Sequence, residues 1–388
     1  MSMSAVEWKP LKDVCNILNG FAFKSQEYVK DGVRIIRISD VQSGYISDKD
    51  LVFYSLDKLD EFKRYLLNTG DLVMSLTGNP GRVALVTNAN MPCALNQRVA
   101  CLRAKNICNS YLFYLFNSKE FEATAFANST GGAQKNLSTT WLGDFEIPIP
   151  SLAKQQEIVS HLDTFTTLIS NLESELDMRR KQYEHYRNQL LNFEGVEKLP
   201  LSDVFEMRGG YTPSTKNEEF WEDGILPWFR MEDIRENGNI LSDSTLHITP
   251  IAVKKNGLFP VNSIILATSA TIGVHALLRV PALSNQRFTA FYPKAGFKDK
   301  VNYKYTYYVF YIIDEWCKNN TVQGGFASVD MAGLRKYMFP IPSLAKQQEI
   351  VEKLDAFENL IQSLEQEIKL RKQQYEYYRE KLLTFEKE

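Results

Sequence analysis

A string of twelve residues that occurs twice limits the folds available to this chain. The sequence PIPSLAKQQEIV occupies residues 148–159 and recurs unchanged at residues 340–351. Without gaps, the match continues to residues 194 and 386, with about 30 identities in 47 paired positions. A repeat that returns only after about 190 residues is far longer than a solenoid repeat. The sequence therefore predicts the duplication of a unit that contains a whole domain.

Shorter matches extend the duplication into the remaining parts of the chain, and all of them keep a similar offset. They are LKDV at 11–14 with LSDV at 201–204, Arg37, Asp40 and Val41 with Arg230, Asp233 and Ile234, NQR at 96–98 and 285–287, and Gly-Gly at 131–132 and 324–325. The predicted boundaries are a first globular domain at 1–147, a first long helix at 148–194, a second globular domain at 195–339 and a second long helix at 340–388.

Each repeated string opens a segment with helical periodicity. Apolar residues alternate four and three apart, which is the spacing of a heptad stripe. Ser151 is the predicted N-cap, and Gly195 follows the first helix. About forty residues per helix correspond to a rod of about 60 Å. The stripe consists of Ile158, Leu162, Phe165, Ile169, Leu172, Leu176, Arg179, Tyr183, Tyr186, Leu190 and Phe193, and of Ile350, Leu354, Phe357, Ile361, Leu364, Ile368, Arg371, Tyr375, Tyr378, Leu382 and Phe385.

The two stripes favour an antiparallel coiled coil with pseudo-two-fold symmetry, because a duplicated stripe then packs on its twin. In the alternative, each helix packs on its own globular domain. Arg179 and Arg371 interrupt the stripe at equivalent positions, either to set the register or with their charged ends in solvent.

The globular halves alternate strand-like and helix-like runs, which indicates α+β domains of the α/β type. Predicted strands are 32–38, 72–75, 83–86, 264–267 and 276–280, and predicted helices are 110–121 and 303–317. No strand order follows from these runs.

Composition excludes several classes of protein. Five cysteines without a CxxC pair and four scattered histidines predict reduced thiols and no metal site. No signal peptide and no apolar run of about 18 residues is present, so we expect a cytoplasmic protein without a membrane span. The net charge of −2 predicts weak DNA binding by the chain alone.

The whole chain resembles the specificity subunits of type I restriction–modification systems. The resemblance rests on the order of domain and helix, the duplicated helix start, GFAFKSQEY at 20–28, GGYTPSTKNEEFWEDGILPWFRMEDI at 209–234 and TGGAQKNLSTTWLGDFEIPIPS at 130–151. The second half has YTPS at 211–214 where the first has FAFK at 21–24, so different half-sites are expected.

The resemblance implies that each domain recognises one half of a bipartite site in double-stranded DNA. The paired helices would be a spacer and a scaffold for two methyltransferase subunits and, through them, restriction subunits. The complex would have adenine methyltransferase and ATP-dependent endonuclease activity. The partners would use S-adenosylmethionine, ATP and Mg²⁺, whereas this chain would bind no cofactor.

The residues themselves give no catalytic motif. Asn79-Pro80 is followed by Gly81 instead of a second proline and an aromatic residue, and no GxxxxGK[ST] loop is present. We therefore expect a non-catalytic subunit. Two alternatives are a stand-alone adaptor that binds DNA or protein at two places, and the recognition arm of another restriction enzyme.

Candidate DNA contacts are sorted by the repeat. Residues that are identical in both halves suit the fold or phosphates, whereas residues that differ can recognise bases. Asn96 and Asn285 belong to the identical group. The candidates are Lys24, Ser25, Asn79, Arg82, Gln97, Arg98, Gln134, Lys135 and Asn136 in the first half, and Thr215, Lys216, Arg235, Asn237, Thr268, Thr271, Gln286 and Arg287 in the second.

A second set of polar residues is identical at the two helix starts, which suggests two copies of one docked partner. A recent duplication would leave the same identity without selection, and both explanations stay open. The residues are Lys154, Gln155, Gln156 and Glu157, and Lys346, Gln347, Gln348 and Glu349.

Overall fold

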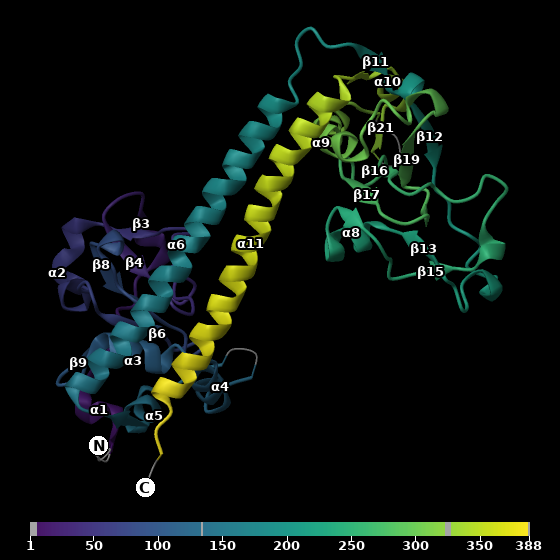
Figure 1. Ribbon diagram of the computed structural model, residues 1–388. Coiled ribbons are helices and arrows are strands. Elements are labelled where there is room, and N and C mark those ends of the chain that lie inside the picture. The colour runs from purple at the N-terminus through teal and green to yellow at the C-terminus, as the bar shows by residue number, and fades with distance from the viewer. Residues whose placement is uncertain (1–5, 133–134, 323–326, 387–388) are drawn as a thin grey trace. The chain divides into compact units, whose positions relative to one another are not determined.

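The computed structural model describes residues 6–132, 135–322 and 327–386. Two compact units divide the chain (Figure 1). Unit 1 contains residues 1–173 and 366–388, and unit 2 contains residues 174–365. Each unit consists of a globular domain and parts of both long helices, α6 (Leu152–Leu190) and α11 (Leu344–Leu383).

Unit 1 is built on two four-stranded sheets. The first has the order β2-β9-β6-β7 and is antiparallel, and the second has the order β3-β5-β4-β8 with β4 and β8 parallel. The strands are β1 (Glu7–Pro10), β2 (Cys15–Asn19), β3 (Tyr28–Val29), β4 (Val33–Ile36), β5 (Phe53–Tyr54), β6 (Leu72–Ser75), β7 (Val83–Leu85), β8 (Cys93–Leu95), β9 (Val99–Ala104) and β10 (Glu146–Ile149).

Most helices of unit 1 pack against the first sheet, whereas Phe62 of a short helix joins the core of the second sheet. Buried residues of β6 and β9 share a core with α3 and with the start of α6, where Ile158 and Leu162 are fully buried. The shorter helices are α1 (Leu11–Val14), α2 (Leu59–Phe62), α3 (Asn109–Phe116), α4 (Lys119–Ala127) and α5 (Thr139–Asp144).

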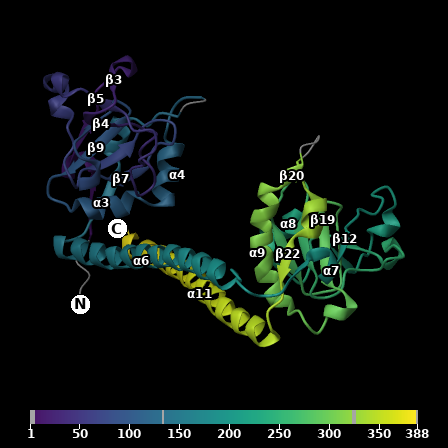
Figure 2. The same ribbon diagram turned by 90° about the horizontal axis from the view of Figure 1, so that it is seen from above.

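Unit 2 repeats this plan with a five-stranded sheet, β12-β19-β16-β17-β14, and a three-stranded sheet, β15-β13-β18. The helix α9 lies against β16 and β17, and Figure 2 shows it at one side of the globular domain of this unit. The strands are β11 (Lys198–Pro200), β12 (Phe205–Gly209), β13 (Leu226–Phe229), β14 (Ile240–Leu241), β15 (His247–Ile248), β16 (Ile264–Ala267), β17 (His275–Leu278), β18 (Leu283–Ser284), β19 (Phe288–Pro293), β20 (Thr321–Val322), β21 (Ser328–Val329) and β22 (Met338–Pro340). The helices are α7 (Leu201–Val204), α8 (Met231–Asn237), α9 (Tyr303–Asn319) and α10 (Met331–Lys336).

The long helices pair in antiparallel fashion within each unit. In unit 1, the early part of α6 meets the late part of α11: Phe165 stacks on Tyr378 with ring centroids 5.4 Å apart, and Glu173 pairs with Lys372. In unit 2, the late part of α6 meets the early part of α11, where Tyr186 stacks on Phe357 at 5.5 Å. The predicted helix-on-helix contact is confirmed within the units.

The alternative packing also occurs, but only at the helix starts. Ile158 and Leu162 enter the core of unit 1, and Ile350 and Leu354 enter that of unit 2. Ser151 caps α6 as predicted, because its Oγ accepts a hydrogen bond from the backbone N–H of Lys154 at 3.3 Å. Each helix therefore begins as a core element of its own domain.

Arg179 and Arg371 are half-exposed and bond within their own helices. Arg179 contacts Glu175 and Gln182, and Arg371 makes the equivalent contacts with Glu367 and Gln374. These contacts favour the explanation in which the charged ends reach solvent.

The mixed α and β content that the sequence predicts is confirmed, whereas the helix predicted at 110–121 is wrong. It is split into α3 and α4, since Ser118 caps a new helix by accepting a hydrogen bond from the backbone N–H of Phe121. Among the described residues, no helix is long and apolar enough to cross a membrane.

Candidate nucleic-acid interface

Three loops of unit 1 meet at one end of its first sheet. They are the hairpin loop (residues 76–82), the NQR loop (residues 96–98) and the arm loop (residues 130–132 and 135–137). Backbone hydrogen bonds join them: the Leu76 N–H donates to Arg98 O at 3.0 Å, the Leu137 N–H to Leu76 O at 2.7 Å, and the Gly78 N–H to Lys135 O at 3.0 Å. The three loops therefore form one connected surface.

A polar groove of about 560 Å³ runs between these loops. It brings together three of the predicted residues, Gln97, Arg98 and Asn136. Among its described lining residues, Arg98 alone carries a charge, and no carboxylate is present. A single cation among amides and hydroxyls suits a phosphate and base edges. The remaining lining residues are Asn19, Leu76, Thr77, Thr130, Leu137, Ser138 and Thr139.

Unit 2 repeats the same backbone connections. Three equivalent hydrogen bonds join its hairpin loop (residues 268–274), its NQR loop (residues 285–287) and the described part of its arm loop (residues 322 and 327–329). The Thr268 N–H donates to Arg287 O at 2.9 Å, the Val329 N–H to Thr268 O at 2.9 Å, and the Ala270 N–H to Ala327 O at 3.3 Å. The duplication therefore preserves the scaffold of the groove as well as the fold.

Within the NQR loops, the three residues have different roles. The Oδ1 of Asn96 accepts a hydrogen bond from the backbone N–H of Arg98, and Asn285 does the same for Arg287. The two asparagines therefore hold the loop in shape. The glutamine and arginine side chains of both loops are exposed. Neither guanidinium group forms an ion pair with a residue that the structure describes.

Other candidates of the first half lie around the groove or away from it. Asn79 is exposed. Lys135 lies 5.4 Å from the Phe126 ring. Arg82 is held by Glu122 and Gln42, so it positions the hairpin loop and is not free to recognise a base. Gln134 lies outside the described residues.

Lys24 and Ser25 are exposed on a different segment, close to the carboxylate of Glu27. Hydrogen bonds from Lys58 and Tyr54 lower the pKa of Glu27 to about 2, so this carboxylate is charged at neutral pH. Its negative charge weakens the case for a phosphate at Lys24.

In the second half, Thr215, Lys216, Arg235 and Asn237 are exposed, and Thr271 is half-buried. The structure corrects one candidate. Thr268 is buried, and its hydroxyl group lies 3.3 Å from both Arg287 O and Thr289 Oγ1, so it supports the loop from inside.

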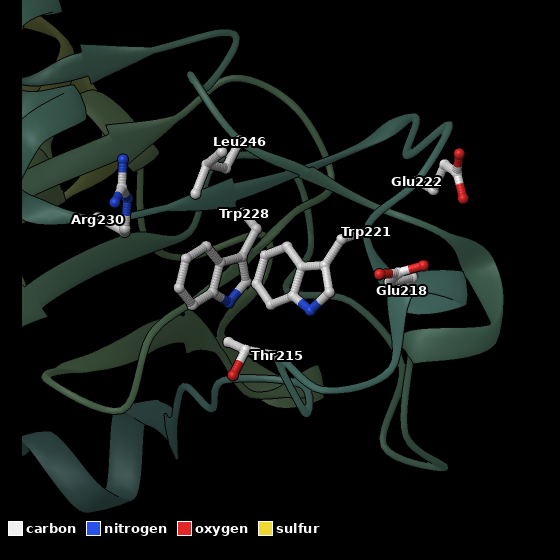
Figure 3. A pocket seen from close by; sticks show the side chains of 7 residues that line it. All are labelled: Thr215, Glu218, Trp221, Glu222, Trp228, Arg230 and Leu246. Carbon is white, nitrogen blue, oxygen red and sulfur yellow. The ribbon is translucent and has the colours of Figure 1, made fainter.

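Thr215 also lines a separate hollow of about 750 Å³ in unit 2 (Figure 3). Trp221 and Trp228 form its centre, with ring centroids 5.0 Å apart in an edge-to-face arrangement. Arg230 lies at one end, and two carboxylates, Glu218 and Glu222, lie at the other. These carboxylates would repel phosphates, so this hollow suits DNA less well than the groove does.

Two of the predicted partner contacts are wrong. Gln155 and Gln347 are buried at 1% and 0% exposure. Gln155 accepts from the backbone N–H of Cys108 and donates to Pro150 O, and Gln347 does the same with Asn302 and Pro342. Buried backbone groups need such partners, which explains the identity of these glutamines without any docked protein.

The remaining residues of that set face solvent. Lys154 pairs with Glu157 at 2.7 Å and Lys346 with Glu349 at 2.9 Å, while Gln156 and Gln348 are exposed. A shallow groove of about 630 Å³ continues from Gln156 along α6. The sequence alone missed most of its lining, because the residues lie off the apolar stripe: Cys108, Val159, Ser160, Asp163, Thr164, Thr167, Leu168 and Asn171.

Comparison with known proteins identifies the family. The model of the type I restriction modification DNA specificity domain matches residues 3–178 and again residues 194–370. The chain belongs to the specificity subunits of type I restriction–modification systems. Two family domains in tandem are what the repeat predicts. The adaptor and the single-chain restriction enzyme are not favoured.

Relatives among specificity subunits differ in how much of their length is matched. The EcoprrI specificity subunit of Escherichia coli is 48% identical over 214 residues, which span 52% of this chain and 53% of that protein. The EcoR124I/EcoR124II specificity subunit of E. coli is 38% identical over 305 residues, which span 71% of each chain. The S subunit of a type I system from M. genitalium has the same fold, with a TM-score of 0.56 at 15% identity over 98% of this chain and 97% of that one.

Proposed function

We propose that this family member gives a type I complex its DNA specificity by recognising double-stranded DNA through two separate domains. The observation that carries the proposal is the three-loop groove of unit 1, together with the equivalent loop connections in unit 2. In unit 1 it contains Arg98 without a described carboxylate nearby, and the equivalent Arg287 is also exposed. An unpaired guanidinium beside exposed amides suits phosphate and base contacts. Each domain would recognise one half of a bipartite site.

The long helices are proposed to set the distance between the half-sites and to carry two methyltransferase subunits. The exposed residues at the two helix starts support this role, since Lys154, Gln156 and Glu157 recur as Lys346, Gln348 and Glu349 on the same local structure. Restriction subunits would join through the methyltransferases. The expected compartment is the cytoplasm.

Adenine methylation and ATP-dependent cleavage would belong to the partner subunits, which would bind S-adenosylmethionine, ATP and Mg²⁺. This chain would contribute binding and orientation only. It would present the DNA at a fixed distance from each methyltransferase, so that target choice and chemistry are divided between different chains.

The test combines the purified chain with its cognate methyltransferase subunit. The chain alone, supplied with S-adenosylmethionine and plasmid DNA, should transfer no methyl groups and bind DNA weakly. The two proteins together should methylate adenines at one bipartite sequence, which sequencing of modified bases would identify. Methyl transfer by this chain alone, or methylation by the partner with unchanged sequence preference when this chain is omitted, would refute the proposal.

A further inference from the structure

The three loops of unit 1 and their equivalents in unit 2 can be compared position by position, because their backbone contacts correspond. Thr77 pairs with Asn136 in an isolated antiparallel bridge of unit 1, and Ser269 pairs with Ser328 in the same way in unit 2. Within the arm loop of unit 1, Asn136 also forms an isolated antiparallel bridge with Thr130. In unit 2, Val322 and Ser328 form the equivalent pair. Asn136 and Ser328 therefore occupy the same place.

The hairpin loop keeps its shape even where the residue is unfavourable. Gly78 has a φ of 77°, in the left-handed region that glycine tolerates. The equivalent Ala270 has a φ of 64°, which is strained for any residue with a Cβ atom. Retention of this conformation with alanine indicates that the backbone of the loop is constrained by its place in the groove.

On this common backbone, the arginines are the same and the arm-loop residues differ. Arg98 and Arg287 follow an asparagine that fixes the loop, and both are exposed. A cation that is identical in two domains with different targets must contact something that both targets share, and every DNA site shares its phosphates.

Asn136 has the properties of a base contact. Its side chain is exposed at the groove, and the Thr77 hydroxyl donates to its Oδ1 at 3.1 Å. That bond orients the amide, leaving its NH₂ group and one oxygen lone pair available. An oriented amide can bind adenine through two hydrogen bonds, whereas the hydroxyl of Ser328 can make fewer contacts.

We infer that the groove divides recognition between its loops: Arg98 and Arg287 contact DNA phosphates in both domains, and Asn136 and Ser328 determine base preference, each in its own half-site. This inference rests on the proposed function and names the specificity-determining position of that site. It predicts two different consequences for substitutions that lie side by side.

The test uses the full chain in complex with its methyltransferase, in a host from which the native gene is deleted. Asn136→Ala should relax one base position of the first half-site, lowering discrimination there by about 5- to 150-fold and leaving the second half-site unchanged. Ser328→Ala should affect only the second half-site. Sequencing of methylated DNA measures both, and Asn136→Ser serves as a conservative variant if the alanine variant is poorly folded.

Arg98→Ala is the matched variant. It should leave the methylated sequence unchanged, lower affinity for cognate and unrelated duplexes by similar factors, and reduce the slope of log K against log salt by about 0.9. Arg287→Ala should have the same effects on the methylated sequence, the affinity and the salt dependence. A changed base preference in either arginine variant, or a uniform loss of binding without changed preference in Asn136→Ala, would overturn the inference. If the wild-type complex methylates no bipartite site, the proposed function fails instead.

Discussion

Units 1 and 2 share a scaffold but differ in the polar groups buried around it. In β17 of unit 2, His275 is fully buried and its Nδ1 lies 2.6 Å from a carboxylate oxygen of Asp314. The equivalent strand position in unit 1 is Val83, which is apolar. Near the helix pair, the hydroxyl group of Tyr308 in unit 2 donates to Asp355 and that of Tyr114 in unit 1 donates to Asp163, but the second partner is Glu358 in unit 2 and Thr166 in unit 1.

This comparison shows which features the duplicated fold requires. Tyr114 and Asp163 of unit 1 correspond to Tyr308 and Asp355 of unit 2. The glutamine at each helix start and the asparagine of each NQR loop are also common to both units. The buried histidine, the glutamate and the arm-loop residues differ. Backbone geometry is therefore preserved by a small set of polar anchors, while the neighbouring positions are free to change.

The largest effect is expected from an exchange of whole domains. Replacing residues 1–147 with a second copy of 195–339 should give a palindromic target in which both halves match the original second half, because the duplication predicts pseudo-two-fold symmetry, in which two equal domains would face opposite strand directions. The reciprocal exchange should duplicate the first half. Sequencing of methylated DNA distinguishes these results. A target altered in both halves by one exchange would show that the domains are not independent.

Replacing Gln155 should destabilise unit 1, and replacing Gln347 should destabilise unit 2 more strongly. Gln155→Ala leaves the backbone N–H of Cys108 and the carbonyl of Pro150 without this partner. The free energy of unfolding should fall by about 3 kcal/mol. Gln347→Ala leaves the backbone N–H of Asn302 and the carbonyls of Pro342 and Lys300 without this partner. The free energy of unfolding should fall by about 4 kcal/mol. Urea unfolding, with hydrogen exchange to locate the change, gives the measurement.

The exposed neighbours Gln156 and Gln348 provide the matched controls, and their alanine variants should change stability by less than about 0.5 kcal/mol. Equal losses for the buried and exposed positions would contradict the anchoring role.

The left-handed residue of the hairpin loop should respond in opposite directions in the two units. Gly78→Ala should cost about 1 kcal/mol, and Ala270→Gly should recover a similar amount. A Cβ atom on Gly78 would meet nothing within 4 Å, so the effect is conformational and not steric. Calorimetry of the two variants tests the pair. A stabilising Gly78→Ala would disprove the equivalence of the loops.

The smallest effect concerns Glu358, which has no acidic counterpart at Thr166. Burial raises the pKa of Glu358 above its ordinary value, despite hydrogen bonds from Tyr183 and Tyr308 that lower it. A carboxyl whose pKa is raised by folding stabilises the folded state at low pH, and this contribution is lost as pH rises through the folded pKa.

Glu358→Gln should therefore gain in melting temperature relative to wild type as the pH rises above the ordinary pKa of a glutamate, by no more than about 4 °C. Thr166→Ser in unit 1 should show no such trend. A constant difference across this pH range would argue against a strained carboxylate.

The sequence predicted the elements that follow strong periodic signals and missed those set by local capping. The strands at 72–75 and 264–267 and the long helices have the predicted bounds or nearly so, because apolar repeats dominate there. Ser118 divides a run that is apolar throughout, and periodicity alone does not detect such a cap.

The same limit applies to the candidate site. Gln97 and Arg98 are exposed and line the groove, because Asn96 holds the NQR loop in shape. The occurrence of NQR in both halves predicted them as candidates. Gln155 was misassigned, because the sequence does not show that a polar side chain will be buried against backbone groups that need hydrogen bonds. The sequence shows that this glutamine is identical in both repeats, but it does not show that the side chain is buried.

The discontinuity of unit 1 has a consequence for synthesis on the ribosome. Tyr375, Leu382 and Phe385 pack against the core of unit 1, and Arg379 donates to Asn117 O, yet these residues are translated well after the first domain. At about 5–20 residues per second, the first domain waits about 10–50 seconds for them. Unit 2 is continuous and has no such wait. We therefore expect the nascent first domain to be the part of the chain that most needs protection from aggregation.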